Sequence, residues 1–127
     1  MSTLLDILKA LPTDPSRAID LYSQLYAASF VVIVQAGTEA SLSSVLFLTY
    51  PTPDNIRELP VFTAGEFVLP NLPAEAVHVT VAGSALWPRL LSIVKTGECE
   101  AAVDPGQAHG IRLRHEMILG MISQYAG

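Results

Sequence analysis

The spacing of apolar residues changes along the chain and separates a helical beginning from a sheet-forming remainder. Residues 3–11 place leucines at helical spacing until Pro12 ends the pattern. The apolar face that follows predicts a second helix from about residue 15 to 27. We therefore interpret residues 1–28 as a helical N-terminal part and residues 29–127 as a sheet with helices.

After the helical part, three stretches have the pattern of strands. Residues 30–34 form a continuous β-branched run, which is typical of a central strand covered on both faces. Residues 45–50 predict a second strand that forms a hairpin with the first through a longer loop. Residues 57–63 predict a third strand, in which Pro60 lacks a ladder donor and indicates an edge or an irregularity.

The middle of the chain predicts one short helix and one alternating strand. Residues 65–73 contain two prolines, so any helix there is expected to be short. Residues 77–81 alternate, with three valines expected to point inward and His78 and Thr80 toward solvent or a partner.

The last third of the chain predicts two further helices around a short strand. One helix is expected to start with Ser84 as its N-cap and to end before Gly97. Residues 98–103 predict a strand, and the apolar spacing over 113–125 predicts a terminal amphipathic helix. Within it, Gly120 costs about 1 kcal/mol relative to alanine, which indicates close packing against another backbone or early fraying.

Together these elements predict an α+β fold. We expect residues 1–127 to form a single domain, with a mixed β-sheet of about five strands and helices packed mainly on one face. Charged residues make up only 15% of the chain, against about 25% in average soluble domains. The extra apolar surface is expected to be buried in a homo-oligomer or to fill a large core.

Charge and cysteine content exclude several classes of function. The net charge is -5 and the seven basic residues are scattered, so neither nucleic acid nor an anionic membrane surface is an expected partner. The longest apolar run, residues 30–34, is far shorter than the roughly 20 residues of a membrane span. The chain begins without the basic region of a secretory signal, and Cys99 is its single cysteine, so we expect a reducing, cytoplasmic location.

Motifs for cofactors, metals and nucleophiles are missing from the sequence. The glycines at 106 and 110 have the wrong spacing for a dinucleotide turn, and there is no Walker loop, so no cofactor is expected. His109 and His115 match no standard metal-ligand spacing, and the two are interpreted as a loop residue and a residue on the solvated face of the last helix. Cys99 lies between two glutamates, which raise a thiol pKa, so it is interpreted as structural.

Three short segments carry a family resemblance. Residues 59–63 read Leu-Pro-Val-Phe-Thr, residues 103–106 read Val-Asp-Pro-Gly, and residues 110–113 read Gly-Ile-Arg-Leu before a helix. In this order they resemble the SseB N-terminal domain family, named for enhanced serine sensitivity and distinct from the type III secretion translocator of the same name. The resemblance is most specific over about 57–122.

The resemblance implies a cytoplasmic bacterial domain without an established catalytic motif. In that family the turn occupied here by Asp104 usually reads Asn-Pro-Gly, an exchange that the turn chemistry of both residues tolerates. The family also tends to have a charged helix after the position of Thr63, and Pro70 and Pro73 shorten that helix here.

These observations leave three functional hypotheses. The first is a non-catalytic binding or regulatory domain that self-associates or binds another protein, with a binding site formed by Thr63, Glu66, Asp104, Gly106, His109 and Arg112. The second is a small-molecule enzyme with acid-base chemistry around His109, Asp104 and Glu66. The third is an assembly or immunity-type partner protein encoded near a secretion or toxin locus.

Overall fold

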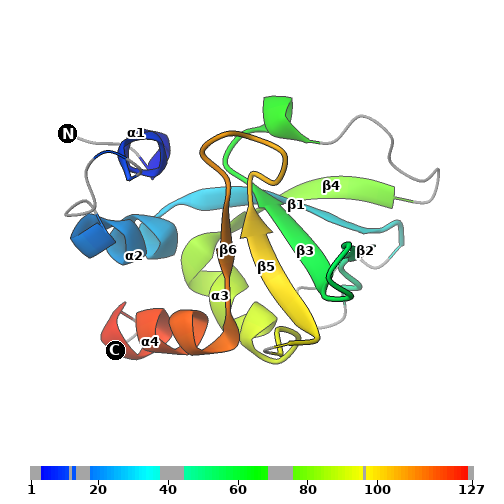
Figure 1. The fold of residues 1–127 in the computed structure, drawn as a ribbon. Coiled ribbons are helices and arrows are strands. Elements are labelled where there is room, and N and C mark those ends of the chain that lie inside the picture. Colours follow the sequence, from blue (N-terminus) through cyan, green and yellow to red (C-terminus); the bar gives the residue numbers. More distant parts are fainter. Residues whose placement is uncertain are drawn as a thin grey trace.

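A mixed β-sheet crosses the molecule and helices cover one of its faces (Figure 1). The structure is a computed structural model that describes residues 4–11, 13, 18–37, 45–68, 76–95 and 97–125. The elements follow in chain order as α1 (Leu4–Ala10), α2 (Ala18–Ala27), β1 (Ser29–Gln35), β2 (Tyr50–Pro51), β3 (Arg57–Phe62), the 3-10 turn η2 (Gly65–Phe67), β4 (Ala76–Ala82), α3 (Gly83–Leu91), β5 (Cys99–Val103), β6 (Ile111–Leu113) and α4 (His115–Tyr125).

The sheet has the strand order β4-β1-β3-β5-β6, and β2 pairs with the beginning of β3. β3 and β5 are parallel, whereas all the other pairs are antiparallel. The predicted α+β class with a mixed sheet is therefore confirmed. β1 lies between β4 and β3, as its continuous apolar run predicts, while the alternating β4 lies at the end of the order.

Residues 45–50 are not the regular strand that their sequence predicts. Leu48 donates its N–H to the oxygen of Ile33 (3.0 Å) and Leu46 accepts from the N–H of Gln35 (2.9 Å), so the expected contact with β1 does form. Only residues 50 and 51 form a regular strand, and they pair with β3. The reason is that β3 pairs with residues 31 and 32 of β1. Residues 45–51 can therefore pair with β1 only beyond that point, where β1 and β3 diverge.

Pro60 lies in an interior strand, at an irregularity and not at an edge. Arg57 donates to Glu98 (2.8 Å) and Val61 accepts from Asp104 (2.9 Å), so odd-numbered residues of β3 bond toward β5. Pro60 therefore directs its nitrogen to the opposite side of β3. There β2 pairs only with the first residues of β3 and β1 only with the last two, so the missing donor falls in the gap between them.

The start of α3 corrects the prediction that Ser84 is its cap. The helix begins at Gly83, and the preceding Ala82 makes no side-chain capping bond. Gly83 instead donates its N–H to the oxygen of Ala28 (2.7 Å), just beyond the end of α2. Another part of the chain therefore satisfies this donor, and a capping side chain is not needed. Pro88 lies within the helix.

The C-terminal region contains a strand that the sequence pattern did not predict. Residues 111–113 form β6, so Leu113 is buried in the sheet and does not belong to the last helix. α4 then runs from His115 to Tyr125. A methyl group added to Gly120 would meet no atom within 4 Å. Of the two alternatives predicted for this glycine, close packing against another backbone is therefore wrong for the residues that the structure describes, and early fraying stays a prediction.

The main core lies between the sheet and the helices. One face of the sheet and helices α1 to α4 contribute to one buried cluster, in which the Trp87 indole donates to the oxygen of Leu25 (2.8 Å) and packs edge-on against Phe30. Phe62 and Ile33 are also fully buried, but by strand alternation they lie on the opposite face and outside this cluster. The candidate site is built on that opposite face.

Candidate functional site

Asp104 joins the ends of two parallel strands. It directly follows β5, its backbone has φ of 48°, and its side chain is fully buried. The carboxylate accepts the backbone N–H of Thr63 at 2.8 Å and the Thr63 hydroxyl at 2.7 Å. Thr63 follows β3, so this one side chain connects the β3 end to the β5 end. Thr63 is not itself the N-cap of the following turn η2, because that position is occupied by Ala64.

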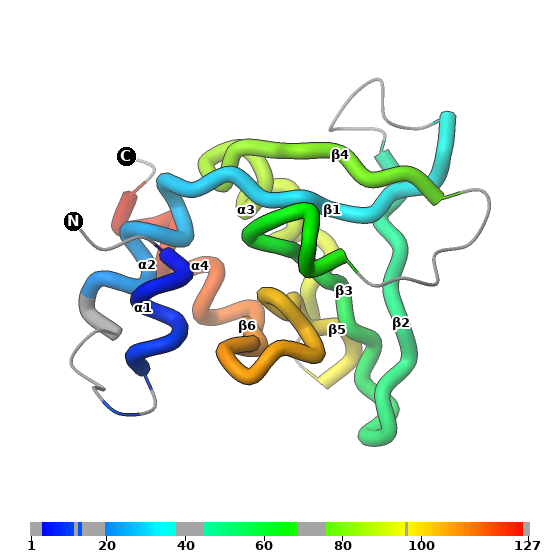
Figure 2. Tube along the Cα trace, turned by 90° about the horizontal axis from the view of Figure 1, so that it is seen from above, coloured from blue at the N-terminus to red at the C-terminus, as the bar shows by residue number. Residues whose placement is uncertain are grey.

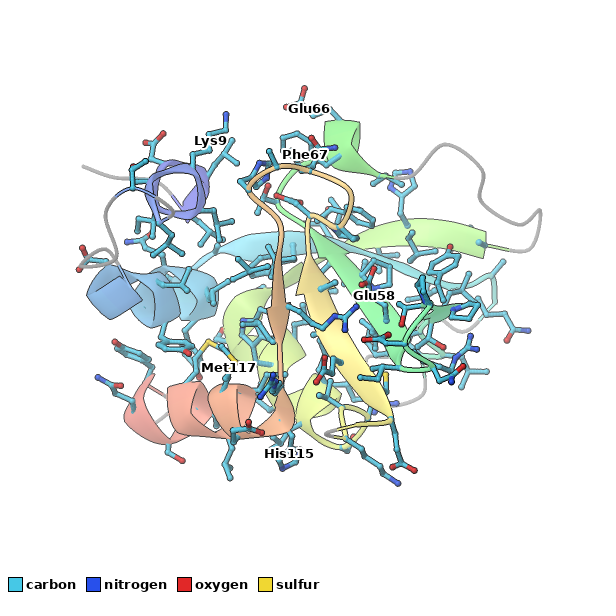
Figure 3. The ribbon with its side chains drawn as sticks, viewed as in Figure 1. Lys9, Glu58, Glu66, Phe67, His115 and Met117 are labelled. Atoms are coloured by element: carbon cyan, nitrogen blue, oxygen red, sulfur yellow. The ribbon has the colours of Figure 1, made fainter. Side chains whose placement is uncertain are left out.

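His109 is the second partner of Asp104. Its Nε2 lies 2.7 Å from Asp104 Oδ2, and its ring packs edge-on against Phe67 with centroids 5.3 Å apart. His109 lies in the loop after β5, as predicted, but the ring is buried. We call Asp104, Thr63, His109 and Phe67 the Asp104 cluster. It connects η2, the end of β3 and the loop 104–110 near the top of Figure 3.

Glu66 does not belong to the Asp104 cluster. It lies on η2 and is exposed, and Figure 3 shows it pointing away from the molecule while Phe67 faces the loop. The turn therefore lies near Asp104 with Phe67 facing the loop and Glu66 facing away, because neighbouring residues of a 3-10 helix project in directions about 120° apart.

A pocket of about 230 Å³ lies beside the Asp104 cluster. Arg112 on β6 and Glu58 on β3 project from the same face of the sheet as Ala102 on β5, which lies between them. The loop after β5 closes one side with Gly106 and its neighbours. We call this the Arg112 pocket, and its lining residues are Glu58, Ala102, Pro105, Gly106, Gln107, Gly110, Ile111 and Arg112.

Carboxylates outnumber guanidinium groups around the pocket. Arg112 contacts Asp54 at 3.1 Å, Glu58 at 3.3 Å and Glu100 at 3.4 Å, and Arg114 approaches Glu100 at 3.7 Å. The hydrogen bond to Asp54 is the main reason that the pKa of Arg112 is raised. The arrangement therefore holds a permanent positive charge inside a site whose net charge is negative.

Asp54 contacts Arg112 on one side and is held on the other side by its own turn. The hydroxyl of Thr52 donates to the Asp54 carboxylate, and this bond, followed by the one from Arg112, lowers the pKa of Asp54 below its ordinary value. Asn55, the next residue, has φ of 64°, which positions the turn. The carboxylate therefore stays charged under all conditions near neutrality.

The six predicted site residues thus separate into three groups. Thr63, Asp104 and His109 meet in the Asp104 cluster, Gly106 and Arg112 line the Arg112 pocket, and Glu66 belongs to neither. Sequence reasoning missed four side chains of the site: Asp54, Glu58, Phe67 and Glu100. The signal that could have found two of them is an acidic residue in a strand pattern, since a buried carboxylate requires a partner.

In the part of the chain that the structure describes, no three His, Cys, Asp or Glu side chains gather where they could hold a metal ion. His115 is half-buried, and its Nδ1 lies 2.9 Å from the oxygen of Val94, so its expected place on the solvated face of α4 is wrong. Over the described ranges, no helix has the length and apolar character needed to cross a bilayer.

Burial keeps Cys99 in its thiol form. Burial raises the pKa of the thiol, the charge of Arg57 opposes this, and Glu100 adds a smaller upward effect. The predicted upward shift of the thiol pKa is confirmed, although burial and not the neighbouring carboxylates is its main cause.

We predict that iodoacetamide alkylates native Cys99 at pH 7.5 at least several-fold more slowly than free cysteine, and that the rate rises with pH. Mass spectrometry measures both; an equal rate in native and urea-unfolded protein would contradict the prediction.

The fold and the site define an α+β domain with a helix-covered mixed sheet and a buried carboxylate-imidazole pair where two parallel strands end. A family model described as the SseB protein N-terminal domain matches residues 4–119, and the chain belongs to that family. The match covers nearly the whole chain, so it extends the expected resemblance over 57–122 into the N-terminal half. No curated protein and no solved structure matches the chain.

Proposed function

We propose that this chain is a non-catalytic binding and regulatory domain that self-associates and that holds one basic side chain of a protein partner in the Arg112 pocket. The pocket itself is the observation that carries the proposal. Its volume of about 230 Å³ is below the range of about 300–1,000 Å³ that small-molecule sites occupy. A single side chain of a partner matches this volume better than a whole metabolite does.

The charges of the pocket select the chemistry of that side chain. Asp54, Glu58 and Glu100 surround Arg112, and Arg114 approaches Glu100 as a second cation. Three carboxylates against two guanidinium groups leave an excess of negative charge at Arg112, which would attract an arriving lysine or arginine and repel an acidic group. The partner is therefore expected to present a basic residue.

One contact favours the enzymatic alternative. The 2.7 Å approach of His109 Nε2 to Asp104 Oδ2 is the geometry in which a carboxylate orients an imidazole for proton transfer. Two features favour a structural role instead: both side chains are buried, and Thr63 already occupies both carboxylate oxygens. If the pair were catalytic, His109→Gln would abolish a hydrolytic activity toward test esters while the unfolding midpoint stayed unchanged.

The binding proposal is tested by titrating the protein with blocked amino acids under NMR observation. We expect N-acetylarginine and N-acetyllysine methylamides to shift the backbone amides of Gly106, Gly110 and Ile111, and N-acetylglutamate methylamide to leave them in place, because only the cations complement the carboxylates. The variant Glu58→Gln should weaken the response to the cations several-fold.

The matched control is Glu98→Gln, which removes the same charge from an exposed residue outside the pocket lining and should respond like the unaltered protein. Equal shifts with the acidic compound, or no shift with either cation at millimolar concentration, would contradict the proposal.

A further inference from the structure

Among the residues that the structure describes, β4 has a strand partner along one of its two edges only. It runs for seven residues, and among the residues that the structure describes it pairs with β1 alone (Figure 2). Natural edge strands are usually protected by proline, lysine, a bulge or short length. The sequence Ala-Val-His-Val-Thr-Val-Ala contains no proline and no lysine, and its register with β1 continues without interruption from end to end.

The backbone groups along this edge can be assigned from the neighbouring bonds. Gly83 donates to Ala28 in continuation of the β1–β4 register, so odd-numbered residues of β4 bond to even-numbered residues of β1. The bonds on the other side of β1 support this assignment, because the odd-numbered residues Ile33 and Gln35 bond there to residues 46–48 and not to β4. Even-numbered residues of β4 therefore direct N–H and C=O away from the sheet: Ala76, His78, Thr80 and Ala82.

The side chains of β4 read the same in both directions about Val79. Ala76 corresponds to Ala82, and Val77 corresponds to Val81. His78 corresponds to Thr80, so the sole exchange is between two exposed polar residues. An antiparallel copy centred on Val79 would place valine opposite valine, alanine opposite alanine, and imidazole opposite hydroxyl. A two-fold axis requires this self-complementarity of one surface.

We propose that two copies of this chain join edge to edge through antiparallel β4 strands, with the two-fold axis at Val79 and a sheet continuous across both copies. In this register His78 faces Thr80 of the other copy, and Ala76 faces Ala82. These are the residues whose N–H and C=O groups point outward, so each facing pair exchanges both bonds. The proposal specifies the surface of the self-association proposed above and is independent of the Arg112 pocket.

The apolar surface beside this edge supports a second copy as the occupant. The three valines of β4 are only half-buried in one copy, although they lie on the same sheet face as the core. A shallow pocket of about 150 Å³ lined by Val79 and Val81 also opens beside them. Valines of the second copy would cover this surface. Interfaces below about 1,200 Å² of buried area are typical of weak complexes, so a dimer held through one strand edge should dissociate on dilution.

Charge substitutions at the two exposed positions test both the interface and its register. Sedimentation velocity over a wide concentration range should show a monomer-dimer equilibrium for the unaltered protein. The double substitution His78→Lys with Thr80→Lys places like charges opposite each other, so the dissociation constant should rise at least tenfold. The double substitution His78→Glu with Thr80→Lys places opposite charges across the axis and should restore or strengthen the dimer.

A control and a second measurement keep the outcomes distinct. The substitutions Ser123→Lys and Gln124→Lys add the same charge at exposed positions on α4 and should leave dimerisation unchanged. In a Cys99→Ser background, Val79→Cys should form a disulfide with itself under mild oxidation, whereas Val77→Cys should not, because only position 79 faces its own copy.

If the unaltered protein stays monomeric at every concentration, both the interface and the self-association fail while the pocket proposal stands. If it dimerises and the lysine pair has no effect, the β4 interface alone is overturned.

Discussion

Replacing Asp104 by alanine should destabilise the protein by about 3–5 kcal/mol, the cost typical of breaking a buried charged contact. The carboxylate accepts both donors of Thr63, lies within hydrogen-bond distance of His109 and is fully buried. Alanine would leave these polar groups without a partner and would also strain a backbone with φ of 48°. Urea unfolding followed by the fluorescence of the single, buried Trp87 measures the loss.

Asparagine at the same position separates charge from hydrogen bonding. Its amide oxygen can accept the Thr63 N–H, and its NH₂ group can donate to the Thr63 hydroxyl and the His109 ring, because a hydroxyl and an imidazole can each also act as acceptors. Asparagine also tolerates a positive φ. Asp104→Asn should therefore cost only about 1 kcal/mol.

The control for Asp104 is Glu98→Ala, a carboxylate removed from an exposed position, which should change stability by less than about 0.5 kcal/mol. If Asp104→Ala costs no more than Glu98→Ala, the Asp104 cluster does not hold the strand ends together. A loss as large for asparagine as for alanine would show that the charge, and not the hydrogen-bond geometry, is what matters.

Replacing Gly83 by alanine should destabilise the protein by about 3 kcal/mol, because an added methyl group has no space. The new carbon would lie 2.5 Å from the oxygen of Leu25, 2.7 Å from that of Ala28 and 2.9 Å from that of Tyr26. These are backbone atoms at the end of α2, so relief requires the two helices to separate. The movement would also disturb the bond between the Trp87 indole and Leu25. Thermal unfolding by circular dichroism should show a midpoint lower by on the order of 10 °C.

Gly120→Ala is the matched control, because it makes the same exchange in another helix. Nothing lies within 4 Å of the added carbon, so the variant should gain up to about 1 kcal/mol from helix propensity alone. Opposite signs for the two substitutions are the expected result. A gain in stability at Gly83 would show that α2 and α3 approach each other less closely than the structure indicates.

Local pattern was sufficient for the elements whose own residues carry the signal. The β-branched run of 30–34 predicted an interior strand, and the alternation of 77–81 predicted exposed His78 and Thr80, which the structure confirms. The local pattern failed where a residue far away in the chain supplies a hydrogen-bond partner. Ser84 has the chemistry of a cap, but the end of α2 already satisfies the first donor of α3 at Gly83.

The candidate site shows the same division. Turn chemistry selected Asp104 and Gly106, because a position with positive φ restricts the residues that can occupy it. No such restriction relates Asp54, Glu58 and Glu100, which come from a turn and two strands and meet at Arg112 because β3, β5 and β6 are adjacent.

The sequence by itself determined the class of fold, the segments that become strands and helices, and the turn that carries Asp104, since these depend on the spacing of neighbouring side chains. Only the tertiary structure decided that this carboxylate is buried against Thr63 and His109, that Glu66 points away, and that β4 pairs with β1 alone among the described residues. The reason is physical: strand pairing and burial are set by contacts between residues far apart in the chain, and no local period records them.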